Sequence, residues 1–150
     1  MSYPVAESRE ITAPAEEVWA LVADLPRMGE FSPENMGGAW ADGAPGPGVG
    51  AAFAGTNKNG VRRWSTMATV VECDPGRSFE IAISKGPLAI ANWRYEFEET
   101  PAGCRVTESW IDHRKVWMRL VSRPLGSHGA AHAKEEMAAT LSNLASALEK

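Results

Sequence analysis

The acidic residue with the clearest chemical potential is Glu108, which lies in a segment of alternating apolar and polar residues. Glu108 has the same parity as Val106 and Trp110, so on a strand its side chain should point toward the apolar face. Burial of a carboxyl group disfavours the charged form and raises the pKa. Glu108 could therefore act as a general acid or base, with Tyr95 assisting proton transfer, or could anchor a ligand hydroxyl.

Glu108 also has a structural interpretation, in which it forms a buried pair with Arg62 or Arg63. Asp112 shares the parity of Glu108 but lies nearer the end of the segment, so it should be solvated or at a cavity mouth. Residues four apart on a strand lie about 13 Å from each other, which is too far for two carboxylates to cooperate directly. Catalytic, ligand-binding and structural roles for Glu108 all remain open from the sequence.

The histidines do not form a recognisable site. His113, His128 and His132 are scattered, and their spacing predicts neither a nucleophile–base pair nor a metal centre. We expect all three on the surface and no bound metal. Four charged residues near or within the last predicted helix should likewise face solvent: Lys134, Glu135, Glu136 and Glu149.

The cysteines and glycines also predict no cofactor. Cys73 and Cys104 both fall in segments with strand character, and we expect two buried thiols rather than a disulfide. The Gly43–Gly50 segment lacks the helix start and the Lys-Ser/Thr ending of a phosphate-binding loop. Asn57 can be explained as a turn residue, and Trp64 as a cavity wall or core residue rather than a cation-binding plate.

Two segments have the spacing of amphipathic helices. Pro14 and the acids that follow it predict a first helix over about 14–24, followed by a helical turn over 25–31. A long helix is predicted over 130–149, with its apolar stripe facing the core. A short helix over 115–122 would belong to the basic segment 114–123, which could be a packed connector, a lid or a membrane-surface element.

The rest of the chain alternates with a period of two and is divided by turn residues. We expect about seven antiparallel strands, and adjacent Val70 and Val71 indicate a possible bulge that would switch faces. The predicted strands are 5–11, 36–41, a strand from 49 to the Asn57–Gly60 turn, 61–73, 77–85, 88–99 and 104–113.

This order of elements predicts an α+β architecture, with one long helix against the apolar face of a curved sheet. A strongly bent sheet cannot close on one helix along its whole length, so the remaining space should be an aromatic-lined cavity, unless the rings fill it. The residues expected to line the cavity are Phe53, Trp64, Phe79, Ile81, Trp93, Tyr95, Phe97, Glu108, Trp110, Trp117, Met137 and Leu141.

Length and charge limit the function further. The 150 residues suit one domain, 1–150, and a net charge of −4 without a long basic run argues against a nucleic-acid partner. No secretory signal and no apolar run of membrane-spanning length can be recognised, so we expect a cytoplasmic protein without stable membrane insertion.

Several motifs, in this order and spacing, resemble the START-like SRPBCC superfamily in its polyketide cyclase/dehydrase and lipid-transport branch. They are Pro14-Ala15-Glu16-Glu17-Val18-Trp19, the segments 24–34 and 55–60, Arg63-Trp64, Asp74-Pro75-Gly76-Arg77-Ser78-Phe79 and Arg105-Val106-Thr107-Glu108-Ser109-Trp110. The resemblance runs over nearly the whole chain. It implies a helix-grip fold, in which a curved antiparallel sheet wraps a long C-terminal helix over a hydrophobic cavity, but it does not imply one activity.

Two functions follow as expectations. The first is binding of a small hydrophobic or aromatic molecule, such as a lipid or polyketide, which needs only the cavity and an entrance. The second is catalysis of the cyclase/aromatase/dehydrase type, in which the cavity folds a reactive chain and Glu108 transfers a proton. Only one inward-facing acid is expected, so the sequence favours binding.

Overall fold

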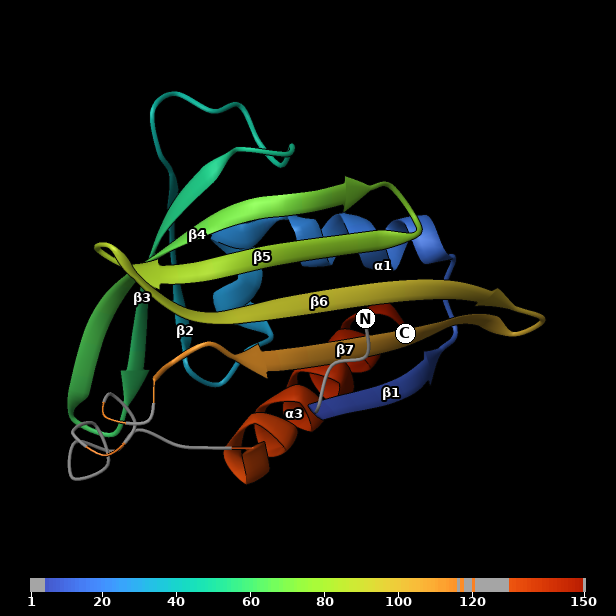
Figure 1. Ribbon diagram of the computed structural model, residues 1–150. Coiled ribbons are helices and arrows are strands. Elements are labelled where there is room, and N and C mark those ends of the chain that lie inside the picture. Colours follow the sequence, from blue (N-terminus) through green and yellow to red (C-terminus); the bar gives the residue numbers. More distant parts are fainter. Residues whose placement is uncertain (1–4, 116, 118–119, 121–129, 150) are drawn as a thin grey trace.

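The computed structural model describes residues 5–115, 117, 120 and 130–149. A seven-stranded antiparallel sheet dominates it (Figure 1), in the order β1-β7-β6-β5-β4-β3-β2. The strands are β1 (Val5–Ile11), β2 (Asn35–Trp40), β3 (Ala52–Asn59), β4 (Arg62–Asp74), β5 (Ser78–Lys85), β6 (Leu88–Thr100) and β7 (Gly103–Asp112). The central part is a meander from β3 to β7, because short turns can join only antiparallel neighbours.

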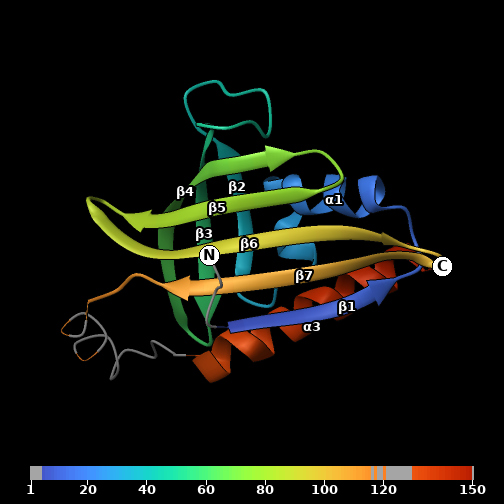
Figure 2. The ribbon, with the colours of Figure 1, turned by 45° about the vertical axis from the view of Figure 1, so that its right-hand side comes forward.

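The first strand and the helices complete the fold. β1 pairs with β7 at one edge of the sheet, so the beginning of the chain lies beside its last strand. The helices are α1 (Ala15–Ala23), the 3₁₀ helix η1 (Leu25–Glu30) and α3 (Ala130–Leu148). Figures 1 and 2 show α1 and α3 on the same side of the sheet, which leaves its other side toward solvent.

The sheet curves strongly toward the helices. In Figure 1, β2, β3 and the first part of β4 run across the direction of the long strands β5–β7. Register shifts mark bulges in three places, one of them between Val70 and Glu72, which confirms the bulge expected there. Gly38, at a positive φ, allows β2 to approach β3 closely, because a Cβ there would collide with the backbone carbonyl of Ala54.

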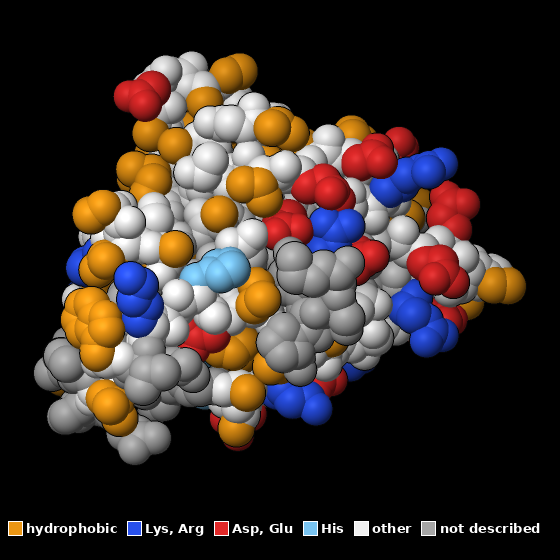
Figure 3. Space-filling view, viewed as in Figure 1, with side chains coloured by type: hydrophobic (Ala, Val, Ile, Leu, Met, Phe, Trp, Pro, Cys, Tyr) orange, Lys and Arg blue, Asp and Glu red, His pale blue; other side chains and the backbone are white. Residues whose placement is uncertain are grey.

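Burial follows the predicted apolar face. One core cluster joins α1, the far part of α3 and the ends of the central strands, and it includes Val18, Phe79 and Leu144. A smaller cluster around Met137 and Trp110 joins α3 to β1 and β7. On the opposite face Arg94 pairs with Glu72, Glu80 and Glu96, and Figure 3 shows acidic and basic side chains interleaved there.

The sequence therefore predicted the elements and their order correctly. The expected α+β architecture, the strands, the two short helices after β1 and the long last helix are all confirmed. The helix expected over 115–122 lies mostly outside the described residues. In the described part of the chain no helix is both long and apolar enough to cross a bilayer.

Candidate functional site

A cavity of about 470 Å³ lies between the concave face of the sheet and the helices. Its walls come from η1, from β3–β7 and from the first half of α3. Most of the predicted lining residues are among those that surround it: Phe53, Trp64, Phe79, Ile81, Trp93, Tyr95, Glu108 and Trp110. Alternation along each strand sends these side chains to the same side, and the curvature brings them together.

Four of the predicted lining residues lie elsewhere, and the expectation for them is corrected. Phe97 and Leu141 belong to the core cluster, and Met137 is buried against β1 and β7, because sheet and helix meet directly at these places and leave no space. Trp117 is 56% exposed and does not line the cavity.

A buried polar pair forms the part of the cavity wall that we call the inner end. Tyr95 on β6 and Glu108 on β7 are directly opposite each other in the strand register. The Tyr95 hydroxyl donates a hydrogen bond of 2.8 Å to Oε2 of Glu108. Both residues are almost inaccessible, at 5% and 3% exposure. The other carboxyl oxygen of Glu108, Oε1, is buried without a hydrogen-bond partner among the residues that the structure describes.

The environment of this pair changes its proton affinity. Burial raises the pKa of Glu108 to about 8; Glu136 adds to the rise, and the hydrogen bond from Tyr95 opposes it. Burial likewise raises the pKa of Tyr95 well above its ordinary value, and the nearby Glu108 raises it further. At neutral pH Glu108 is therefore mainly a neutral acid, and with Oε2 accepting from Tyr95, its proton is available at Oε1.

The pairing with Arg62 or Arg63, which the structural interpretation of Glu108 offered, is wrong. Neither Arg62 nor Arg63 bonds to it within the described residues; Arg62 lies over the Trp64 ring, 5.6 Å from its centroid. Trp64 therefore does contact a cation, which was not expected. Asp112 pairs with Arg114 at 2.9 Å, and Arg114 borders the cavity, consistent with a position near its mouth.

The side walls combine aromatic rings with a few polar groups. Trp93 and Trp110 lie on neighbouring strands with ring centroids 6.1 Å apart. Asn57, expected in a turn, instead lies in β3 and lines the cavity, where its amide donates a 3.2 Å hydrogen bond to the Thr66 hydroxyl. Such a lining is typical of pockets that bind mainly apolar molecules and orient them through few polar contacts.

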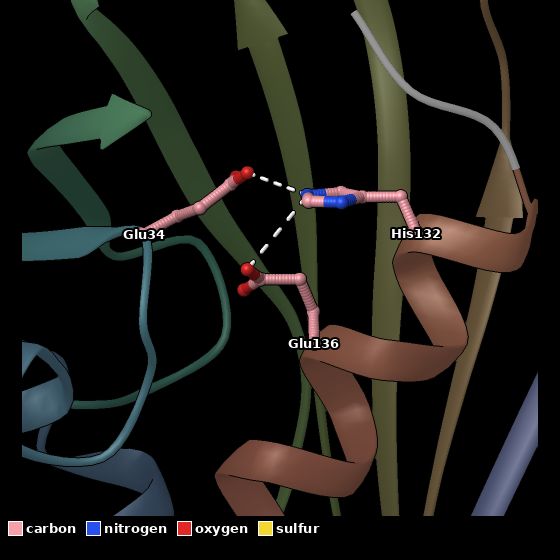
Figure 4. Close-up of side chains that lie close together, drawn as sticks. All are labelled: Glu34, His132 and Glu136. Atoms are coloured by element: carbon pink, nitrogen blue, oxygen red, sulfur yellow. Dashed lines mark hydrogen bonds and ion pairs between the residues drawn. The ribbon is translucent and has the colours of Figure 1, made fainter. Parts of the chain in front are cut away.

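Three further polar residues converge at the part-exposed end, which we call the mouth (Figure 4): Glu34, His132 and Glu136. The Nε2 atom of His132 lies 2.6 Å from Oε1 of Glu34 and 3.7 Å from Oε1 of Glu136. Their side chains are 24%, 29% and 14% exposed in the order Glu34, His132, Glu136. Burial raises the pKa of Glu136 to about 7; Glu34 adds to the rise and His132 opposes it.

This cluster corrects the sequence analysis, which placed His132 and Glu136 toward solvent. The two residues are four apart on α3, so they lie on one helix face. The turn after η1 carries Glu34 over that face, and no local sequence pattern indicates this contact across 98 positions. His113 is exposed, as expected, and contacts Asn92, while His128 lies outside the described residues.

The cysteines agree with most of the expectation. Both thiols are free, Cys104 is buried, and Cys73 is only half-buried. Burial raises the pKa of each thiol, and neither residue borders the cavity. They therefore contribute no nucleophile to this site.

Comparison with known proteins extends these observations. The family described as polyketide cyclase/dehydrase and lipid transport matches residues 4–149. A comparison with curated proteins gives no match. A polyketide-cyclase-like protein of Corynebacterium glutamicum, Cgl2372, is 30% identical over 96% of this chain and 85% of its own, with a TM-score of 0.54.

More distant structures show the same fold. Protein CV1439 of Chromobacterium violaceum is 12% identical, covers 99% of both chains and has a TM-score of 0.73. StfQ, a di-domain aromatase/cyclase of the steffimycin biosynthetic pathway, is 11% identical over 96% of this chain and 49% of its own, with a TM-score of 0.73. The curved sheet and long last helix thus form the helix-grip fold.

Proposed function

The chain belongs to the polyketide cyclase/dehydrase and lipid-transport family of the START-like SRPBCC superfamily, and on that premise we propose that its single domain, 1–150, binds a small, largely aromatic ligand with a carbonyl or hydroxyl oxygen. The apolar part of this ligand would lie between the rings that line the cavity. Its oxygen would reach the Tyr95–Glu108 pair. We also propose that the protein does not bind nucleic acid.

One observation carries the proposal. The Oε1 atom of Glu108 is buried at the cavity wall without a partner in the described part of the chain. A buried polar atom left unsatisfied is destabilising by about 1–3 kcal/mol, so native structures usually pair such atoms with protein, water or ligand. A ligand oxygen hydrogen-bonded to Oε1 would complete the pair.

The size of the cavity supports the same conclusion. Its volume of about 470 Å³ lies within the range of roughly 300–1,000 Å³ that is usual for small-molecule sites. The rings of Trp93 and Trp110 offer flat apolar surfaces to an aromatic ligand.

The first test is native mass spectrometry of freshly purified protein, with organic extraction of any bound compound. The second compares binding of 1-naphthol and naphthalene through quenching of tryptophan fluorescence. One added hydrogen bond of about 1 kcal/mol should make 1-naphthol bind about 5-fold more tightly. Replacement Glu108→Leu should abolish this preference, whereas Glu108→Gln, which still hydrogen-bonds, should keep it.

Glu98→Gln is the matched control, because Glu98 is exposed on the outer face of the same sheet. It should leave the binding of both compounds unchanged. Equal affinity of the wild-type protein for 1-naphthol and naphthalene, or an undiminished preference in Glu108→Leu, would contradict the role assigned to Glu108.

A second function, catalysis of ring closure, is favoured by the proton affinity of Glu108. With a pKa of about 8, this carboxyl can give and take a proton near neutral pH. An intramolecular aldol closure of a poly-β-ketone removes one proton from an α-carbon and delivers one to the carbonyl oxygen. Glu108→Gln should then abolish turnover while affinity is kept; unchanged turnover would exclude Glu108 as the proton carrier.

A further inference from the structure

The mouth of the cavity brings together three potential metal ligands that the proposed function does not use. Glu34, His132 and Glu136 each offer one ligand atom, and these three atoms lie within 4.8 Å of one another. Figure 4 shows the three side chains pointing toward a common centre, one from the turn before β2 and two from successive turns of α3. The donor set is one imidazole nitrogen and two carboxylate oxygens.

The spacing of these atoms suits a small divalent ion. Ligand atoms lie about 2.0–2.2 Å from zinc, so neighbouring ligands in a tetrahedral site are about 3.3 Å apart. The His132–Glu136 separation of 3.7 Å is close to this value, and the His132–Glu34 separation of 2.6 Å requires only a small opening. Since Glu34 is on a turn, rotation of its side chain can supply that change.

The chemistry of the donors points in the same direction. Two carboxyl groups and an imidazole converge in a part-buried position, and a divalent cation bound between them would favour the ionised form of both carboxyl groups. Imidazole favours transition metals such as zinc over magnesium and calcium, which prefer oxygen ligands.

We propose that Glu34, His132 and Glu136 bind one Zn²⁺ ion at the mouth of the cavity. All three residues line the cavity. The three ligands that the described residues supply leave a fourth tetrahedral position, as in catalytic rather than structural zinc sites. That position would face the cavity and accept water or an oxygen of a bound molecule, such as a carboxylate, a phenolate or an enolate.

This site is independent of the ligand proposed above, because zinc binding can be measured with no organic molecule present. The protein would be treated with a chelator, dialysed and titrated calorimetrically with ZnCl₂. One ion should bind per chain. Glu136→Gln and His132→Gln should each weaken binding by more than about 10-fold, since even residues that only support metal ligands often contribute that much.

The chain offers matched controls for each variant. Glu135 is exposed and adjacent to Glu136 on α3, so Glu135→Gln changes the same net charge outside the cluster. His113→Gln removes an exposed imidazole that does not border the cavity. Cys73→Ser removes a half-buried thiol that could bind zinc elsewhere. All three should keep the affinity of the wild-type protein.

A cobalt titration gives a structural readout that the affinity alone does not. Co²⁺ in this site should show the visible absorption of a four- or five-coordinate ion without a thiolate charge-transfer band. Far-UV circular dichroism and urea denaturation would establish that each variant is folded. Failure of the wild-type chain to bind zinc, or binding that survives both cluster variants or is lost in Cys73→Ser, would overturn the proposal and leave the naphthol result unaffected.

Discussion

The inner end of the cavity and its mouth both hold carboxyl groups, but these groups differ in burial and in the partners that stabilise them. At the inner end Glu108 is almost inaccessible, and its hydrogen-bond partner Tyr95 is neutral. Glu108 therefore keeps its proton near neutral pH and avoids a buried charge. At the mouth Glu34 and Glu136 share an imidazole and partial access to water. The pKa of Glu136 is also raised, to about 7, but this residue lies beside an imidazole and has part access to water, so a bound cation can displace its proton near neutral pH.

The difference separates two kinds of chemistry within one cavity. A neutral acid deep among aromatic rings can donate a hydrogen bond to an uncharged ligand or exchange a proton with it. A part-exposed cluster of two carboxyl groups and one imidazole offers ligand atoms to a cation instead. Variants in the two regions should therefore respond differently to apolar packing, to pH and to metal.

The largest effect is expected from Phe79→Ala at the inner end. Phe79 is fully buried and contacts Trp19 edge to face. Its removal should lower the free energy of unfolding by about 3–5 kcal/mol, through lost burial and the void that remains. Urea denaturation measures this change. Trp64→Ala, at a part-exposed wall of the same cavity, should be clearly less destabilising. An equal decrease in the free energy of unfolding for the two variants would mean that the inner end does not belong to the core.

The next effect is the pH dependence of stability due to Glu108. Its pKa rises from 4.5 to about 8 on folding, so between these values the unfolded chain releases the proton first and stability falls as pH rises. Below pH 4.5 both states are protonated and the effect vanishes. The fall should reach a few kcal/mol by pH 8.

Urea denaturation at pH 4 to 8 gives the free energy of unfolding as a function of pH for the wild-type protein and for Glu108→Gln. The difference between these two curves measures the contribution of Glu108, because all other acids are present in both proteins. Glu108→Gln should become the more stable protein toward high pH. Parallel curves would show that Glu108 is ionised in the folded protein.

A smaller effect is expected from Tyr95→Phe. Loss of the hydroxyl removes the hydrogen bond to Oε2 of Glu108 and should lower the free energy of unfolding by about 1–2 kcal/mol. Because that bond opposes the rise in the pKa of Glu108, the variant should raise this pKa further. A double-mutant cycle with Glu108→Gln isolates the coupling between the two side chains, and additive effects would argue against their contact.

The smallest effect on stability is expected at the mouth. With metal removed by a chelator, His132→Gln should lower the free energy of unfolding by less than about 1 kcal/mol, since part-exposed pairs contribute little. Thermal or urea denaturation gives the value. A loss above about 2 kcal/mol would indicate that the cluster mainly holds α3 against the turn that carries Glu34.

The sequence predicted the site residues correctly where alternation along a single strand sets the direction of the side chain. The period of two placed Glu108 and Trp110 on the inner face of β7, and Tyr95 on that of β6. It did not show that Tyr95 and Glu108 are opposite each other, because register depends on turns and bulges along both strands. It also overestimated the cavity at Phe97, where sheet and helices pack directly.

The mouth could be predicted only in part, for a reason of sequence distance. The spacing of His132 and Glu136 places them on one helix face, but the same spacing is common on solvated surfaces. What distinguishes this pair is Glu34, which the turn after η1 brings within 2.6 Å of His132. A single sequence contains no local signal for such a contact.

Local patterns thus determined the strands, the helices, their order and the inward direction of Glu108, because each depends on neighbours a few residues apart. Tertiary structure alone decided that Glu108 is bonded to Tyr95 rather than to Arg62 or Arg63, that Arg62 lies over Trp64 and that three residues cluster at the mouth. These depend on how far the sheet curves and where a turn crosses a helix, and both are set by packing between segments distant in the chain.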